Sequence, residues 1–76
     1  MISNQNTVTR AGDRVDFLDL EAEARVVIVV HADNDLRDGF GGFLGRELDH
    51  SGVATGRQLW GWDTQITAIN GVEYHP

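Results

Sequence analysis

Five consecutive β-branched residues, Val26 to Val30, constrain the fold of this chain more than any other feature. Branching at Cβ restricts the side-chain rotamers, which costs little in a pleated strand and more in a helix. An unbroken apolar run also indicates that both faces of the strand are buried. The sequence therefore predicts a central strand over Arg25 to His31.

Turn and strand signals alternate after this run. Asp33 to Gly39 is rich in turn-forming residues, as is Asp49 to Gly56. Between them, Phe40 to Leu48 is interrupted by glycines, which indicates a sharply bent or bulged strand of the kind a small barrel needs. Arg57 to Trp62 alternates as a further strand would.

The end of the chain carries a β-hairpin signal. Ile66 to Ile69 and Val72 to Tyr74 are strand-forming segments separated by Asn70-Gly71. This dipeptide readily adopts the positive φ angles of a type I′ turn, so we expect two antiparallel strands here.

The segment Asp13 to Arg25 permits two interpretations. Asp13 can cap a helix, and good helix formers follow it. Val15 and Phe17 flank Asp16, an alternation equally typical of a strand. A short helix is the favoured prediction.

These segments together predict a mainly β fold with a short N-terminal helix. The expected architecture is an SH3-like or Sm-like barrel, with a twisted antiparallel sheet as the alternative. Residues 1–12 are expected to form a flexible or edge arm, and residues 13–76 one small β-rich domain.

Length and cysteine content limit how such a domain is stabilised. A chain of 76 residues buries a thin core, and without cysteine it has no disulfide or thiolate zinc site to compensate. A homo-oligomer is therefore plausible. No segment approaches the ~18–20 apolar residues of a membrane span, and Met1 to Arg10 lacks the apolar stretch of a signal peptide. We expect a cytoplasmic protein that does not contact a membrane.

The charge balance favours some partners over others. Twelve acidic residues stand against six arginines and no lysine, giving a net charge of −6. Nucleic-acid binding draws on cationic contacts, so direct binding to nucleic acid is not expected. The charge suits either docking on a basic surface of another protein or simple solubility.

No motif in the sequence supports catalysis or metal binding. Gly39 to Gly45 resembles a dinucleotide loop, but Leu44 stands where its third glycine belongs. Asp33 to Gly39 resembles a calcium loop, but its fifth position is Arg37. The histidines, His31, His50 and His75, are widely separated, and Ser51 lacks a nucleophile elbow. We predict a non-enzymatic protein without metal or cofactor.

Two groups of residues are the candidate partner-binding sites. The first is an acidic strip that would pair with basic residues if Asp16, Asp19 and Glu23 share one helical face. The second is a tryptophan pair on one face of a strand, which either fills the core, as is favoured in so small a chain, or anchors an interface. The candidates are Asp13, Asp16, Asp19, Glu21 and Glu23, with Trp60 and Trp62.

The order of these features resembles the Rof family of Rho-termination inhibitors. The similarity rests on acidic residues and Leu18 before the strand Val26 to Val30, and on Asp63 and Ile66 to Ile69. It implies a short helix, an Sm-like barrel, and an acidic surface that occludes an RNA-binding site on the target. The glycine-rich Gly39 to Gly45 and the paired tryptophans depart from that family. Small acidic phage inhibitors of host nucleic-acid machinery fit equally well.

The predicted function is therefore an inhibitor or regulator, for example of transcription, that masks a basic nucleic-acid-binding surface of a partner protein. One alternative is a barrel that binds a small ligand or nucleotide through Gly39 to Gly45 and the tryptophans. The other is a structural homo-oligomer whose edge strands pair.

Overall fold

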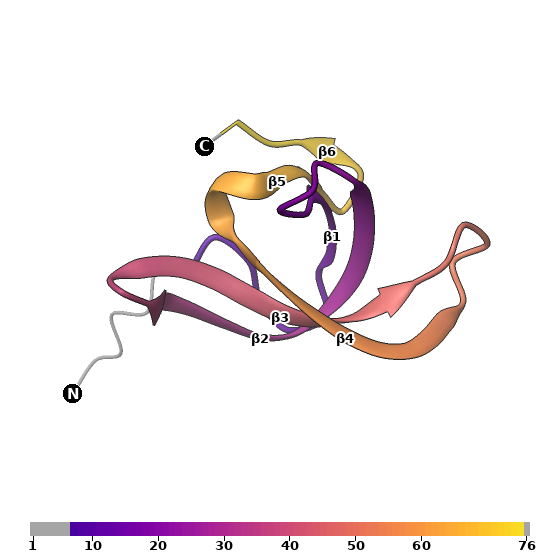
Figure 1. Cartoon of the computed structure of the whole chain (residues 1–76), viewed down its shortest axis with the longest axis horizontal. Coiled ribbons are helices and arrows are strands. Elements are labelled where there is room, and N and C mark those ends of the chain that lie inside the picture. Colours follow the sequence, from indigo (N-terminus) through magenta and orange to yellow (C-terminus); the bar gives the residue numbers. More distant parts are fainter. Residues whose placement is uncertain (1–6, 76) are drawn as a thin grey trace.

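A single antiparallel sheet organises residues 7–75, the part of the chain that the computed structural model describes (Figure 1). A one-turn 3-10 helix, η1 (Asp63–Gln65), connects β4 to β5. The spatial order of the strands is β4-β3-β2-β1-β5-β6, so β4 and β6 are the edges and the sheet is not closed. The mainly β prediction is confirmed, as an open sheet. The strands are β1 (Arg14–Leu18), β2 (Ala24–Arg37), β3 (Phe40–Leu48), β4 (Ala54–Trp62), β5 (Ile66–Ile69) and β6 (Val72–Glu73).

The run of β-branched residues lies in β2, between β1 and β3, so its central position is confirmed. The predicted burial of this strand on both faces is not confirmed. Val27 and Val29 are buried, whereas Val26 and Ile28 are half-buried and Val30 is exposed. The pairing of β2 with β3 shifts register between Val29 and His31, which marks a bulge there.

The helix predicted over Asp13 to Arg25 is wrong. Arg14–Leu18 forms β1, which pairs with Ala24–Ile28 of β2. The alternation of Val15 and Phe17 with polar neighbours decides the structure, because a strand buries both side chains on one face. Helix propensity alone is a weak preference beside that burial.

The turn predicted over Asp33 to Gly39 is much shorter than expected. β2 continues through Arg37, and only Asp38 and Gly39 connect it to β3. Their φ angles of 54° and 82° are those of a two-residue hairpin turn. Asn70 and Gly71, with φ angles of 52° and 81°, confirm the predicted hairpin between β5 and β6.

The core lies on one face of the sheet, here called the inner face, as β1 and β5 fold over β2, β3 and β4 (Figure 1). The rings of Phe17 and Phe43 meet edge to face at 5.0 Å between centroids. Thr9, from the predicted N-terminal arm, is also completely buried; residues 1–6 of that arm lie outside the described residues. The core residues are Val15, Phe17, Val27, Val29, Phe43 and Ile66.

The glycines of β3 are explained by close packing. A Cβ on Gly45 would lie 2.7 Å from Val27 Cβ, and one on Gly42 would meet the carbonyl oxygen of Gly61 and the side chain of Leu36. These distances are shorter than real Cβ contacts, so both positions need glycine.

Candidate functional site

Trp60 and Trp62 project from the outer face of β4. Side chains alternate along a strand, and the two inward positions of this segment are Leu59, which packs on the core, and the buried Gly61. The two indoles meet edge to face at 5.1 Å and 89°. Trp60 is 42% exposed and Trp62 is half-buried. The favoured prediction that the tryptophans fill the core is therefore wrong.

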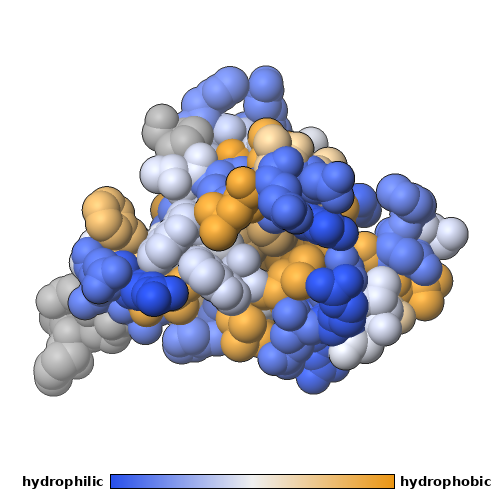
Figure 2. All heavy atoms as spheres, in the orientation of Figure 1, coloured by the Kyte–Doolittle hydropathy of each residue, from blue (hydrophilic) through white to orange (hydrophobic). Residues whose placement is uncertain are grey.

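Phe40 extends this aromatic pair across the sheet. It is 64% exposed, and its ring centroid lies 6.1 Å from that of Trp62 at an interplanar angle of 74°. Phe40, Trp62 and Trp60 form what we call the aromatic strip. Elsewhere, hydrophobic residues form separate orange areas among hydrophilic blue ones on the face seen in Figure 2.

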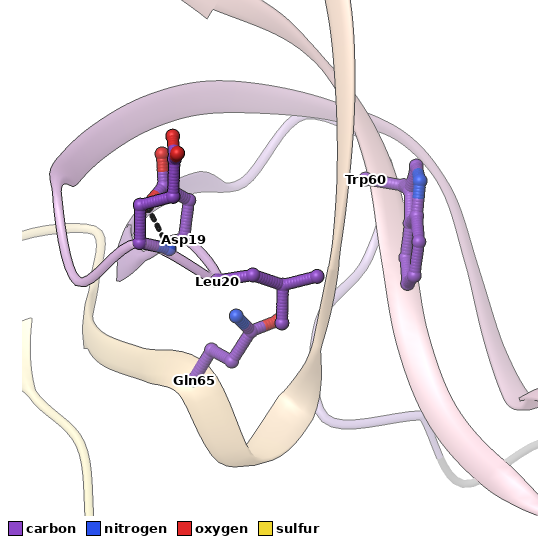
Figure 3. A pocket seen from close by; sticks show the side chains of 5 residues that line it. Asp19, Leu20, Trp60 and Gln65 are labelled. Atoms are coloured by element: carbon purple, nitrogen blue, oxygen red, sulfur yellow. Dashed lines mark hydrogen bonds between the residues drawn. The ribbon is translucent and has the colours of Figure 1, made fainter.

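One end of the aromatic strip borders a hollow of about 290 Å³ against the β1–β2 turn, the loop hollow. Figure 3 shows the side chain of Leu20 directed toward Trp60, with Gln65 beside it. Leu20 is 79% exposed. The hollow brings together three predicted site residues, because it joins Trp60 to Asp19 and Glu21 from a distant part of the chain.

Asp19 holds the β1–β2 turn in place. Its carboxylate accepts hydrogen bonds from the backbone N–H of Glu21 (2.8 Å) and Glu23 (2.9 Å), and from Arg25 Nε (2.9 Å). The Glu23 backbone hydrogen bond first, and then the Arg25 side chain, lower the pKa of Asp19 below its ordinary value. Asp19 is therefore ionised at neutral pH, but its oxygens already accept these three hydrogen bonds. The exposed Glu21 is the carboxylate better placed to meet a partner.

The remaining acidic residues do not form the predicted strip, because the helix that would align them is absent. Asp13 accepts hydrogen bonds from Arg10 N and Asn70 Nδ2. Asp16 Oδ1 lies 3.6 Å from Arg14 Nε, and Glu23 Oε1 lies 3.5 Å from Arg25 Nη2. The prediction that Asp16, Asp19 and Glu23 share one helical face is therefore wrong.

The other end of the aromatic strip borders a second hollow of about 420 Å³, the hairpin hollow. Burial raises the pKa of Asp63 above its ordinary value, and among the described residues Asp63 Oδ1 is buried without a hydrogen-bond partner. A Cβ on Gly41 would lie 2.5 Å from Asp63 Oδ2, so this glycine gives the carboxylate its space. The lining residues are Asp38, Phe40, Gly41, Trp62, Asp63 and Thr64.

Sequence reasoning missed Phe40, Asp38 and Leu20 as site residues. The available signal was Asp38-Gly39, a two-residue hairpin dipeptide that sets Phe40 at the start of a strand. Nothing in the sequence indicated Leu20, because its exposure follows from the turn that Asp19 organises.

The histidines His31 and His75 each lie near one carboxylate rather than in a larger cluster of described residues. His31 Nε2 is 3.7 Å from Asp33 Oδ2, and His75 Nε2 is 3.5 Å from Glu73 Oε2. Within residues 7–75 no three histidine or carboxylate side chains are grouped to hold a metal ion. Ser51 donates its backbone N–H to Asp49 in the β3–β4 turn. In the same part of the chain no helix is long and apolar enough to cross a membrane.

The chain matches no protein-family model, and no curated protein sequence or solved structure matches it significantly. The resemblance to the Rof family remains a prediction from the sequence.

Proposed function

We propose that this chain is a non-enzymatic binding protein that masks a basic, nucleic-acid-binding surface of a partner protein. The contact surface is the aromatic strip of Phe40, Trp62 and Trp60 together with the loop hollow. An arginine-bearing segment of the partner lies along the indoles, and carboxylates at both ends of the strip select for its positive charge.

The observation that supports this proposal is the exposed edge-to-face pair of Trp60 and Trp62. An indole exposed to water forgoes the free energy that burial would give it, and a partner that covers it recovers this energy. Tryptophan and arginine are also enriched among the residues that contribute most binding energy in protein interfaces. The planar guanidinium of arginine also stacks on aromatic faces, and it does so more often than lysine.

The distribution of charge supports a basic occupant. Glu21 and Asp19 line the hollow beside Trp60, and Asp38 and Asp63 line the hollow beside Trp62. With a net charge of −6, the chain repels nucleic acid and attracts the surfaces that nucleic acid binds.

The test compares proteins captured from the host lysate by the wild type and by Trp60→Ser. A captured protein should be lost with Trp60→Ser and retained with the matched control Val72→Ser, which removes an exposed apolar side chain from β6. The purified partner should then bind the wild type less tightly as salt rises, and the wild type should displace RNA or DNA from it.

A partner that binds both serine variants equally would contradict the assignment of the surface. A partner whose binding to nucleic acid is unaffected by saturating wild type would contradict the masking function. Glu21→Gln separates steering from packing, because it should slow association at low salt while leaving the tryptophan contacts in place.

A structural homo-oligomer is the second candidate, and the free edge of β4 favours it. β4 has nine residues and, among the strands of residues 7–75, pairs with β3 alone. Backbone groups along its other side could therefore pair with a second copy. Light scattering at high micromolar concentration distinguishes the two, since a monomer removes this candidate. The ligand-binding alternative stays a prediction. Protein atoms occupy the space beside Gly42 and Gly45, whereas a Cβ on Gly39 would have nothing within 4 Å.

A further inference from the structure

The geometry points to the hairpin hollow as a binding site for a single arginine side chain of a protein partner, held between two aromatic rings and a carboxylate. This inference rests on the proposed function, because it specifies which chemical group of the basic partner the surface recognises. It concerns a different hollow from the one beside Trp60, and it can fail independently.

The walls of the hollow suit a planar cation. The rings of Phe40 and Trp62 stand at 74° to each other with their centroids 6.1 Å apart, so they form a corner. A guanidinium that lies flat against one ring face turns its N–H edge toward the face of the other ring. Cations are attracted to aromatic faces, most strongly to indole, and arginine takes this position more often than lysine.

The floor of the hollow supplies the negative charge. Asp63 lines the hollow. Its Oδ1 is buried without a hydrogen-bond donor among residues 7–75, so a cation in the hollow meets this carboxylate on the Oδ2 side, beside Gly41. An ionised carboxylate that is partly withdrawn from water gains more from a cation than a fully hydrated one does. Asp38 at the rim adds a second carboxylate, whose side chain is 84% exposed.

Within residues 7–75, no cationic side chain forms an ion pair with Asp63. Arg37 Nε lies 3.9 Å from Asp38 Oδ2, at the limit of an ion pair, and its side chain lines a separate hollow with His31, Leu36, Leu44 and Trp60. The imidazole of His31 lies beside Asp33, with Nε2 3.7 Å from Asp33 Oδ2. The volume of about 420 Å³ accommodates a guanidinium with part of its aliphatic chain.

The test titrates the full chain with the blocked tripeptide acetyl-Gly-Arg-Gly-amide, followed through the indole N–H resonance of Trp62 in two-dimensional NMR. The same tripeptides with lysine and with citrulline, the neutral analogue of arginine, are the ligand controls. We expect binding in the millimolar range, weakened by about tenfold for citrulline and by less for lysine.

Two variants locate the site. Asp63→Asn preserves the shape of the side chain and should weaken binding of the arginine peptide by about tenfold. Gly41→Ala should do the same, because the added methyl group displaces Asp63 Oδ2 while its other neighbours, Asn34 Cα and Asp33 O, remain at 3.4 Å. Equal binding of the arginine and citrulline peptides, or unchanged binding by Asp63→Asn, would overturn the inference.

A third variant separates this inference from the proposed function. Glu21→Gln changes the loop hollow and should leave binding of the tripeptide to the hairpin hollow unaltered. If the tripeptide does not shift the Trp62 resonance but Trp60→Ser still loses a partner, the arginine site is refuted and the masking function stands. If the tripeptide binds but no partner depends on Trp60, the masking function fails alone.

Discussion

Gly61 and Phe43 lie opposite each other on β4 and β3, and a Cβ on Gly61 would stand 2.7 Å from Phe43 Cζ. Phe17 is also close, with two ring atoms at 3.2 Å from the same position. The interior therefore has no space for a side chain at this point of β4. Because strand side chains alternate, a glycine facing inward sets Trp60 and Trp62 facing outward.

Gly61→Ala should consequently destabilise the fold. The methyl group has to displace Phe43 or Phe17, and overpacking of this kind costs about 1–3 kcal/mol. Chemical denaturation would measure the change, with Gln58→Ala on the exposed part of β4 as the control. An unchanged free energy of unfolding for Gly61→Ala would show that the two rings are not tightly packed.

The β1–β2 turn contains an unfavourable residue that can be improved. Asp19 bonds the backbone N–H groups two and four residues on, and Asp49 does the same in the β3–β4 turn. The fourth residue of the second turn is Gly52, with φ of 82°, whereas the first has Ala22 with φ of 61°. Left-handed backbone is costly for alanine and not for glycine.

Ala22→Gly should therefore stabilise the protein by about 0.5–1 kcal/mol, the gain from relieving this strain less the added chain entropy of glycine. Ala24→Gly, two residues later at the start of β2, is the matched control and should destabilise. Thermal melts of both variants would check the sign. A lower melting temperature for Ala22→Gly would contradict the turn geometry.

The stability of the fold should depend on the ionisation of Asp63. Burial raises the pKa of Asp63 in the folded state above its ordinary value of 3.8, so ionisation of Asp63 opposes folding at neutral pH. Asp63→Asn removes that penalty and should be more stable than the wild type at pH 7. The difference should shrink as the pH falls toward 3.8, where the wild-type carboxyl is protonated.

The measurement is the difference in free energy of unfolding between variant and wild type across this pH range, which cancels the contributions of other carboxylates. Asp38→Asn is the control, because the Asp38 side chain is 84% exposed. A difference that stays constant with pH would mean that the burial of Asp63 does not influence its ionisation.

Local signals predicted much of the sheet. The β-branched run gave the central strand, and Asn70-Gly71 gave the final hairpin, because both signals act through a few neighbouring residues. The helix prediction for Asp13 to Arg25 is wrong because helix propensity and strand alternation conflict there. Pairing of β1 with both β2 and β5 decides in favour of the strand, and that pairing is a long-range interaction.

The candidate surface was predictable only in part. Trp60, Trp62, Asp19 and Glu21 were identified by residue type, but their arrangement depends on Gly61 and on the turn at Asp19. Phe40 joined the strip through the register of β3 with β4, and Asp63 through the absence of a side chain at Gly41. Such contacts join residues distant in sequence, which no local pattern encodes.

The buried carboxylate of Glu47 supports a final prediction about two arginines. The Glu47 side chain is 9% exposed; Arg25 Nη1 lies 3.5 Å and Arg57 Nε 3.8 Å from its oxygens, and Thr55 Oγ1 donates to it at 2.9 Å. The Arg25 side chain is 30% exposed and also bonds Asp19, whereas that of Arg57 is 65% exposed.

Arg25→Met should therefore lower the melting temperature more than Arg57→Met, because it leaves a buried charge with only a solvent-screened partner and releases the β1–β2 turn. Raising the salt concentration should reduce the small effect of Arg57→Met further and change that of Arg25→Met little. Equal losses from the two variants would show that Glu47 is stabilised by water and Thr55 rather than by Arg25.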